Sequence, residues 1–144
     1  MGRALRVALA VLAGLSLAPG VRADIAELLG GSPQVLSPQQ AFAPELVAGT
    51  DGMLELRFTI APGHYLYRDR LAVTGADGAA LAPALPAGEP HDDAEFGRVS
   101  VLRGPQRIAL SIPARPGAGI DLRYQGCAEG RLCYAPVRIH LQLP

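Results

Sequence analysis

Apolar and polar residues alternate strictly over several short stretches of this 144-residue chain. In MLELRFTI, residues 53–60, four apolar side chains fall on one face of an extended chain and three polar side chains on the other. Period-two alternation of this kind is typical of β-strands with one buried face. The same pattern predicts strands at residues 107–113, 121–127 and 137–143, and shorter strands at 65–68, 71–75 and 98–103.

Clusters of turn-forming residues separate these stretches, among them AGTDG, GADG, PALPAGEP and ARPGAG. Many short strands joined by such turns, without intervening helices, favour an all-β sandwich or barrel. At this length we expect an immunoglobulin-like β-sandwich with a cysteine-bearing hairpin. The antibody type is disfavoured, because the chain has no Trp and its two cysteines are too close in sequence to bridge two sheets.

The first 23 residues have the pattern of a cleaved secretory signal peptide. Arg3 and Arg6 precede an apolar run over residues 7–18, and Val21-Arg22-Ala23 forms a possible cleavage site. The alternative is an uncleaved membrane anchor, but the run is shorter than the roughly 20 residues that a spanning helix needs. We therefore expect export to the periplasm, a short N-terminal segment at 24–34 with a helical turn in DIAELL, and one domain at 35–144.

The charge of the predicted mature chain argues against one class of partner. Residues 24–144 contain ten arginines and all 13 acidic residues, hence a formal charge of −3, and no lysine. A mildly acidic domain without a basic face is not expected to bind nucleic acid.

Cys127 and Cys133 are the only cysteines, and they flank the five residues AEGRL. The stretches on either side resemble the arms of a hairpin, which would place the two cysteines opposite each other on adjacent strands. A disulfide across so short a loop stabilises by only about 2.4 kcal/mol in the chain-entropy model. Reversible thiol–disulfide chemistry, a static disulfide and metal binding all remain open at this point.

Metal binding lacks ligands, because structural zinc takes four Cys or His side chains and the three histidines show no suitable spacing to the cysteines. His64 and His91 fall in predicted turns, and His140 on the solvent face of a strand. The thiols also lack strong activation, since Arg131 is the only close cation and Glu129 opposes it. Such a pair suits exchange with a partner's reactive cysteine upon docking.

The hairpin YQGCAEGRLCYAPV resembles the active-site hairpin of the N-terminal periplasmic domain of the DsbD thiol:disulfide interchange family. Tyr-Gln-Gly-Cys, five residues and Cys-Tyr-x-Pro all match the family pattern. The segments VLSPQQAFAP (35–44), APGHYLYRDRL (61–71) and HDDAEFGRVSVLR (91–103) match in the same order. The last resembles the family's loop of acidic, aromatic and glycine residues. The likeness covers residues 35–143.

This resemblance implies an immunoglobulin-like domain whose cysteine pair relays electrons. The donor would be a membrane-embedded reductase, which for a chain ending at Pro144 would be a separate protein. The acceptors would be periplasmic thioredoxin-fold proteins, namely a disulfide isomerase and a cytochrome c maturation factor. Cys133 would form the mixed disulfide and Cys127 would resolve it. No cofactor and no metal are expected.

The resemblance also implies a cap loop over the cysteines, with an aromatic lid. The family pattern is Asp-Glu-Phe, a second aromatic and Gly, whereas this chain has Asp93-Ala94-Glu95-Phe96-Gly97. Aligning on the glycine places Glu95 at the lid position and Phe96 beside it. The other interpretation of this acidic stretch is a solvated turn.

Tyr65 and Tyr67 would share one face of a strand, either as a wall of the cysteine site or as ordinary sandwich packing. An alternative function for the whole chain is a non-catalytic periplasmic β-sandwich that binds a partner and carries a structural disulfide.

Overall fold

The computed structural model describes residues 35–144, so the predicted signal peptide and the segment 24–34 lie outside the described residues. Within this range no helix is both long and apolar enough to cross a membrane. The elements are one short α-helix, one 3-10 turn (Arg68–Arg70) and twelve strands: α2 (Pro38–Phe42), β1 (Pro44–Ala48), β2 (Met53–Thr59), β3 (His64–Tyr67), β4 (Ala72–Gly75), β5 (Ala80–Leu81), β6 (Glu89–Asp93), β7 (Gly97–Leu102), β8 (Pro105–Pro113), β9 (Gly119–Tyr124), β10 (Gly126–Ala128), β11 (Leu132–Cys133) and β12 (Val137–Gln142).

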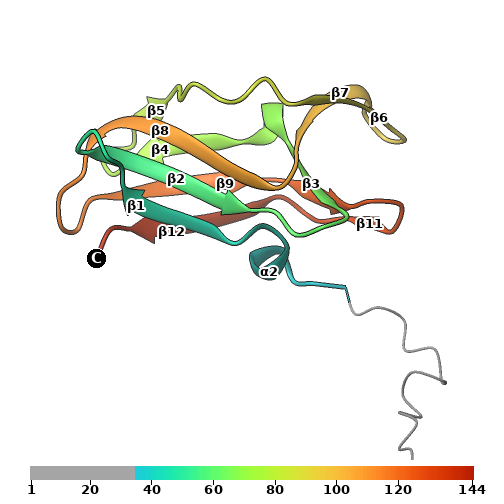
Figure 1. Ribbon diagram of the computed structural model, residues 1–144, viewed down its shortest axis with the longest axis horizontal. Coiled ribbons are helices and arrows are strands. Elements are labelled where there is room, and N and C mark those ends of the chain that lie inside the picture. The colour runs from blue at the N-terminus through green and yellow to red at the C-terminus, as the bar shows by residue number, and fades with distance from the viewer. Residues whose placement is uncertain (1–34) are drawn as a thin grey trace, which may run out of the picture. The chain divides into compact units, whose positions relative to one another are not determined.

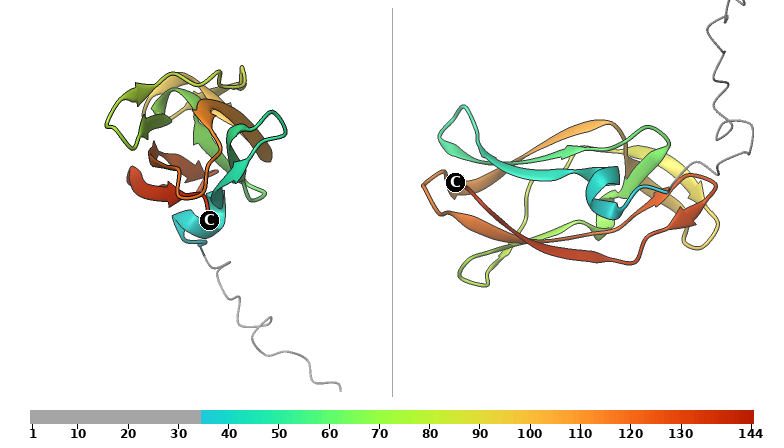
Figure 2. Two further views of the ribbon diagram at one scale, coloured as in Figure 1. Left: turned by 90° about the vertical axis from the view of Figure 1, so that its left-hand side faces the viewer. Right: turned by 90° about the horizontal axis from the view of Figure 1, so that it is seen from below.

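Two antiparallel sheets face each other and enclose the main core (Figures 1 and 2). One has the strand order β1-β2-β8 and the other β12-β9-β4-β5. Leu56 and Phe58 of β2 point inward, and so do Leu122 and Tyr124 of β9, all at most 1% exposed. The rings of Phe58 and Tyr124 meet edge to face across the core, 5.7 Å apart. This is the immunoglobulin-like sandwich that the sequence predicts.

A third sheet, with the order β11-β10-β3-β7-β6, forms the end of the molecule away from the C-terminus (Figure 1). The chain passes from the sandwich into this end sheet at Gln125, between β9 and β10. Gly126 follows at a close crossing, where a Cβ atom would lie 2.6 Å from Phe42 Cζ and closer still to the Tyr65 carbonyl oxygen. Only glycine fits there without a shift of its neighbours.

The predicted alternation is confirmed on β2, β8 and β9, where inward and outward residues follow one another. Strand β3 differs, because Tyr65, Leu66 and Tyr67 are all buried. Leu66 joins the main core on one side, while the two tyrosines pack with Val101 and Cys127 on the other. Both faces of β3 are therefore covered, which the two-residue period did not predict.

Two segments differ from their sequence-based interpretation. The acidic stretch described as a loop is mostly strand, because Glu89–Asp93 pairs with β7 and only residues 94–96 form the turn. Residues 38–42 form a short helix that the strand pattern missed. Ser37 accepts a hydrogen bond from the Gln40 backbone N–H, and the Gln40 side chain returns to the Ser37 backbone, which is a capping box.

Candidate functional site

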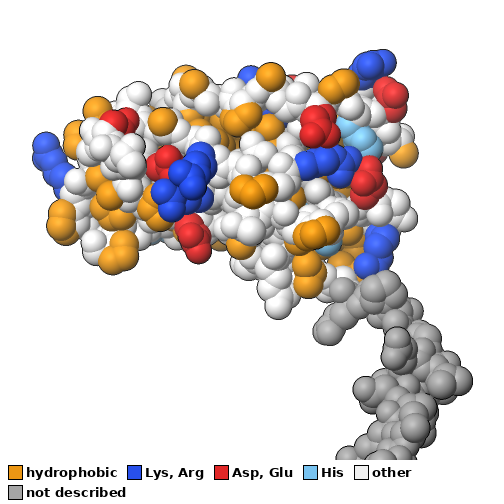
Figure 3. Space-filling view, in the orientation of Figure 1, with side chains coloured by type: hydrophobic (Ala, Val, Ile, Leu, Met, Phe, Trp, Pro, Cys, Tyr) orange, Lys and Arg blue, Asp and Glu red, His pale blue; other side chains and the backbone are white. Residues whose placement is uncertain are grey.

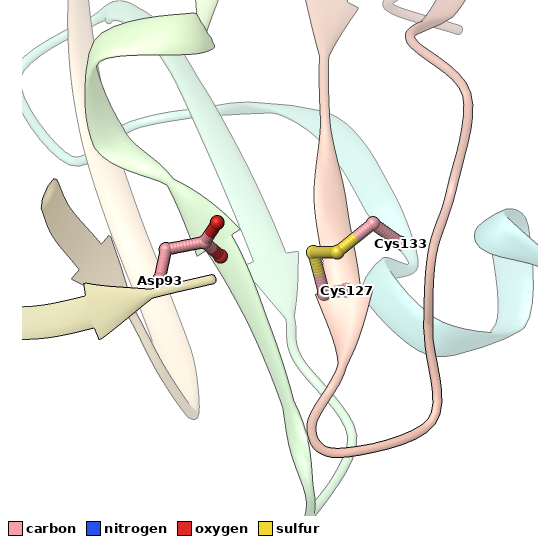
Figure 4. A group of neighbouring side chains, drawn as sticks. All are labelled: Asp93, Cys127 and Cys133. Carbon is pink, nitrogen blue, oxygen red and sulfur yellow. A yellow bond between two sulfur atoms is a disulfide. The ribbon is translucent and has the colours of Figure 1, made fainter. Parts of the chain in front are cut away.

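The cysteines lie on a two-strand hairpin at the edge of the end sheet. Cys127 of β10 and Cys133 of β11 are paired in register and joined by a disulfide, as the hairpin prediction requires (Figure 4). The two residues differ sharply in burial: Cys127 is 1% exposed, whereas Cys133 is exposed. An attacking thiolate from solvent therefore reaches the sulfur of Cys133 first.

One tyrosine hydroxyl from β3 contacts both sulfurs of the disulfide, and a second tyrosine packs beside it. The Tyr67 hydroxyl oxygen lies 3.1 Å from Cys127 Sγ and 3.6 Å from Cys133 Sγ. The Tyr65 and Tyr67 rings meet edge to face, 5.5 Å apart, so the two side chains share one face as predicted. Burial raises the pKa of both hydroxyls, and the hydrogen bond to Asp93 raises the pKa of Tyr67 further. Both remain protonated donors at neutral pH.

Asp93, at the end of β6, accepts four hydrogen bonds. Its Oδ2 accepts from the hydroxyls of Tyr67 (2.6 Å) and Tyr65 (3.0 Å), and its Oδ1 accepts from the backbone N–H groups of Glu95 (2.8 Å) and Phe96 (3.0 Å). The hydrogen bond from Tyr67 is the main cause that lowers the pKa of Asp93 to about 2. The carboxylate is directed toward the disulfide (Figure 4) and holds the β6–β7 turn against the tyrosines.

Phe96 is half-buried in the same turn and packs beside the site. Its ring meets the Tyr67 ring edge to face at 5.4 Å, and the Arg70 guanidinium stacks 3.7 Å from its centre. Arg70 also donates a hydrogen bond of 2.9 Å to Gln125 Oε1. Phe96 thus lies between Tyr67 and Arg70, and its role as the lid stays a prediction.

A groove of about 580 Å³ runs between the β6–β7 turn and the cysteine hairpin. Its lining residues are Tyr65, His91, Asp92, Asp93, Ala94, Glu95, Cys127, Ala128, Glu129, Gly130, Arg131, Leu132 and Cys133. Arg103 closes one side, because it forms a two-pronged ion pair with Glu129 (2.8 and 3.1 Å) and lies 3.6 Å from Glu89. The hydrogen bond from Arg103 also lowers the pKa of Glu129.

All seven residues predicted for the site meet at this end of the sheet, but sequence reasoning missed several supports. Tyr134, next to Cys133, donates a hydrogen bond to the Leu36 carbonyl oxygen and stacks on His64. The prediction that His64 and His91 lie in turns is wrong, because they belong to β3 and β6. Tyr134, Arg70 and Arg103 all stand in quoted motif segments, but none of the three was assigned a part in the site.

One group of three potential metal-ligating side chains occurs within residues 35–144. A carboxylate oxygen of Asp93 and the sulfurs of Cys127 and Cys133 lie within 4.8 Å of one another. Three atoms are one ligand fewer than a structural zinc site uses. The sulfurs are also bonded to each other here, whereas zinc takes thiolates.

The fold and this site together define a class of protein, an all-β domain of immunoglobulin-like architecture that carries a disulfide-bonded cysteine pair on an edge hairpin. A family model described as "Thiol:disulfide interchange protein DsbD, N-terminal" matches residues 32–143. The chain belongs to this family of DsbD N-terminal domains.

Curated relatives and solved structures agree with this assignment. The chain is 43% identical over 108 residues, 72% of its length, to the thiol:disulfide interchange protein DsbD of Cronobacter sakazakii, and covers 18% of that protein. It is 48% identical over 86 residues, 60% of its length, to DsbD 2 of Pseudomonas aeruginosa, and covers 14% of it. The chain thus spans less than a fifth of the length of these relatives.

Among solved structures, the reduced N-terminal domain of Neisseria meningitidis DsbD superimposes with a TM-score of 0.65 at 32% identity. The match covers 75% of this chain and 88% of that one. The complex between the DsbD and PilB N-terminal domains of the same organism matches with a TM-score of 0.61 at 32% identity, over 76% of this chain and 87% of that one.

Proposed function

We propose that this chain is a periplasmic thiol–disulfide exchange module, a protein-disulfide reductase. It relays electrons through Cys127 and Cys133 from a membrane reductase to thioredoxin-fold partners, among them a disulfide isomerase and a cytochrome c maturation factor. The observation that carries the proposal is the asymmetry of the disulfide, with one buried and one exposed cysteine on an edge hairpin. A static staple has no need for such asymmetry, whereas stepwise exchange with a docked partner does.

The exchange follows from this asymmetry. In the reduced domain the Cys133 thiolate attacks a partner's disulfide, forming a mixed disulfide and releasing one partner thiolate, which takes up a proton. Cys127 then attacks Cys133 Sγ, restores the internal disulfide and releases the second partner thiolate. Two electrons pass to the partner, and the domain ends oxidised. A reductase thiol restores the reduced domain by the reverse steps.

The residues around the disulfide have assigned roles in this proposal. Tyr65 and Tyr67 form the wall against which both sulfurs rest. Asp93 fixes the turn that carries Glu95 and Phe96, so this turn is the cap of the site. The Tyr67 hydroxyl donates its hydrogen bond to Asp93, so the Tyr67 oxygen accepts a hydrogen bond from the thiol of reduced Cys127. This hydrogen bond favours the thiol over the thiolate in the resting reduced form. The resting pair is then protected from stray oxidants.

The relatives support the proposed partners. The solved complex of a DsbD N-terminal domain with a PilB N-terminal domain shows that a domain of this fold docks another protein domain. The matched relatives are thiol:disulfide interchange proteins, which supports the proposed activity. Periplasmic location rests on the signal-peptide pattern of residues 1–23.

A redox titration tests the proposal. The oxidised protein is equilibrated with glutathione or thioredoxin buffers, and free thiols are counted by alkylation while circular dichroism reports the fold. We expect reversible reduction of one disulfide with the fold retained. A pair that stays oxidised at potentials that reduce thioredoxin contradicts the proposal and favours the structural disulfide.

Single-cysteine variants test the roles of the two sulfurs in the same system. The Cys127→Ala variant keeps the exposed Cys133 and should capture a thioredoxin-fold partner as a stable mixed disulfide. The Cys133→Ala variant is its matched control and should capture little, because Cys127 is 1% exposed. The opposite pattern would reverse the assignment of the attacking cysteine.

A further inference from the structure

We infer that the groove beside the disulfide selects thiols that carry positive charge close to their sulfur, and that Glu95 is the residue that sets this preference. The inference rests on the proposed function, because it concerns the thiols that exchange with the same disulfide. In proteins, the corresponding partner has a reactive cysteine flanked by Arg or Lys side chains.

The charges of the groove are unbalanced. Four acidic side chains line it, namely Asp92, Asp93, Glu95 and Glu129, against a single arginine, Arg131. Charged side chains and a histidine gather at this end of the molecule in the space-filling view (Figure 3). A thiolate that approaches Cys133 must enter this negative field, and a cation on the same molecule offsets the repulsion.

Two of these acidic groups form ion pairs, and a third is stabilised by hydrogen bonds from neutral groups. Glu129 is held by Arg103, Asp93 accepts four hydrogen bonds, and Asp92 lies 4.0 Å from Arg98 in an exposed ion pair. Glu89 just outside the groove also faces Arg103.

Glu95 differs from the other three. Its side chain is exposed and forms neither an ion pair nor a hydrogen bond with any residue between 35 and 144, whereas Asp93 has four hydrogen bonds and the other two have ion pairs. It also stands where the family pattern has the aromatic lid. Among residues 35–144, Glu95 is therefore a carboxylate without an ion-pair partner in the groove that also contains the exposed Cys133, at a position where an apolar ring would make no distinction by charge.

The exchange step shows where the charge acts. A thiolate attacks Cys133 Sγ, the S–S bond breaks, and Cys127 leaves as a thiolate that takes up a proton; a second thiol then releases the mixed disulfide as a small disulfide and leaves both cysteines reduced. Attack brings the charge of the entering molecule into the groove that Glu95 lines. At low ionic strength, a net charge in such a groove changes the rate on the order of tenfold between cationic and anionic thiols.

Three thiols of one skeleton measure this preference: cysteamine, 2-mercaptoethanol and 2-mercaptoethanesulfonate, which end in an ammonium, a hydroxyl and a sulfonate. The rate at which each reduces the oxidised protein is divided by its rate with bis(3-hydroxypropyl) disulfide, a neutral reference that none of the three thiols forms, so that differences in nucleophilicity cancel. We expect the normalised rate to be highest for the ammonium thiol, intermediate for the hydroxyl thiol and lowest for the sulfonate thiol. The ratio of the highest to the lowest rate, here called the span, should be about tenfold at 10 mM ionic strength and about twofold at 500 mM.

The Glu95→Gln variant should narrow the span at 10 mM to about threefold, because one uncompensated charge is removed. Glu45→Gln, an exposed carboxylate on β1 of the sandwich, is the matched control and should leave the span unchanged. Equal normalised rates for the three thiols overturn the inference but leave the proposed function intact. If the rate ratio between the ammonium and sulfonate thiols stays about tenfold in Glu95→Gln, Glu95 does not set the preference. If no thiol reduces the disulfide, the proposed function itself fails.

Discussion

Asp93 joins the two parts of the candidate site through one carboxylate. One oxygen accepts from the tyrosines of the disulfide wall, and the other accepts from the backbone of the cap turn. A neutral carboxyl group cannot accept four hydrogen bonds as strongly, so protonation weakens both contacts at once. The charge of Asp93 is thus part of the structure of the site.

The pH dependence of stability tests this role. The pKa of Asp93 is about 2 in the folded protein against 3.8 for the unperturbed group, so the unfolded state binds more protons between these values. The contribution of Asp93 is therefore present above about pH 4 and lost as the pH falls toward 2. Allowing for partial exposure, it amounts to about 1 to 2 kcal/mol.

Urea unfolding at pH 5 and pH 2.5 measures this loss. Between pH 5 and pH 2.5 the free energy of unfolding should fall in both proteins. The decrease should be about 1 to 2 kcal/mol smaller in Asp93→Asn than in the natural sequence, because the amide does not titrate. Tyr67→Phe removes the main hydrogen bond that lowers the pKa and should reduce the loss in part. Equal losses in all three proteins would mean that Asp93 does not couple to folding.

The cysteine hairpin depends on its crossing point at Gly126. Gly126→Ala places a Cβ against Phe42 and the Tyr65 carbonyl oxygen, so the hairpin or β3 must shift, at a cost of about 3 kcal/mol. Gly130 at the hairpin tip is the matched control, since a Cβ there meets nothing within 4 Å and only its φ of +67° opposes a side chain. Gly130→Ala should cost about 1 kcal/mol.

Chemical denaturation of both variants measures these costs. The larger loss in Gly126→Ala should be accompanied by a changed rate of disulfide reduction, because β10 carries Cys127 directly after the crossing. Similar losses in the two variants would show that the packing at Gly126 is looser than the contacts imply.

The elements that the sequence predicted well are those with one buried face. Alternation located β2, β8 and β9, and the spacing of Cys127 and Cys133 located the hairpin. The pattern failed for β3, whose two covered faces remove the alternation, and for β6, whose Glu and Asp residues suit a loop but pair with β7 at an edge. The short helix α2 was missed because its sequence signal is local. Only Ser37, Pro38 and Gln40 indicate it, and the strand periodicity does not extend to these residues.

The sequence predicted which residues gather at the candidate site, but not the side chains that support them. Motif matches identified the cysteines, the tyrosines and the acidic turn. Arg70 and Arg103 follow the tyrosines and the acidic turn by only a few residues, but their stacking and ion pairs arise only when β3, β7 and the hairpin meet in the end sheet. No one-dimensional pattern encodes such contacts.

Residues 35–144 contain two separate apolar clusters. The main core lies between the sandwich sheets and excludes the cysteines, whereas Cys127 belongs to a small cluster with Tyr65, Tyr67 and Val101 at the end sheet. Because neither cysteine belongs to the main core, we expect the sandwich to hold the fold when the disulfide opens.

Reduction should therefore lower the free energy of unfolding only slightly. A closed loop of about seven residues accounts for at most about 2.4 kcal/mol in the chain-entropy model, and the β10–β11 pairing already holds the strands together. Urea unfolding of the oxidised and reduced proteins should give one cooperative transition each, with similar m-values and midpoints close together. Cys127→Ala/Cys133→Ala should behave like the reduced form. A reduced protein that unfolds without denaturant would show that the disulfide is structural, and would favour the non-catalytic β-sandwich over the electron relay.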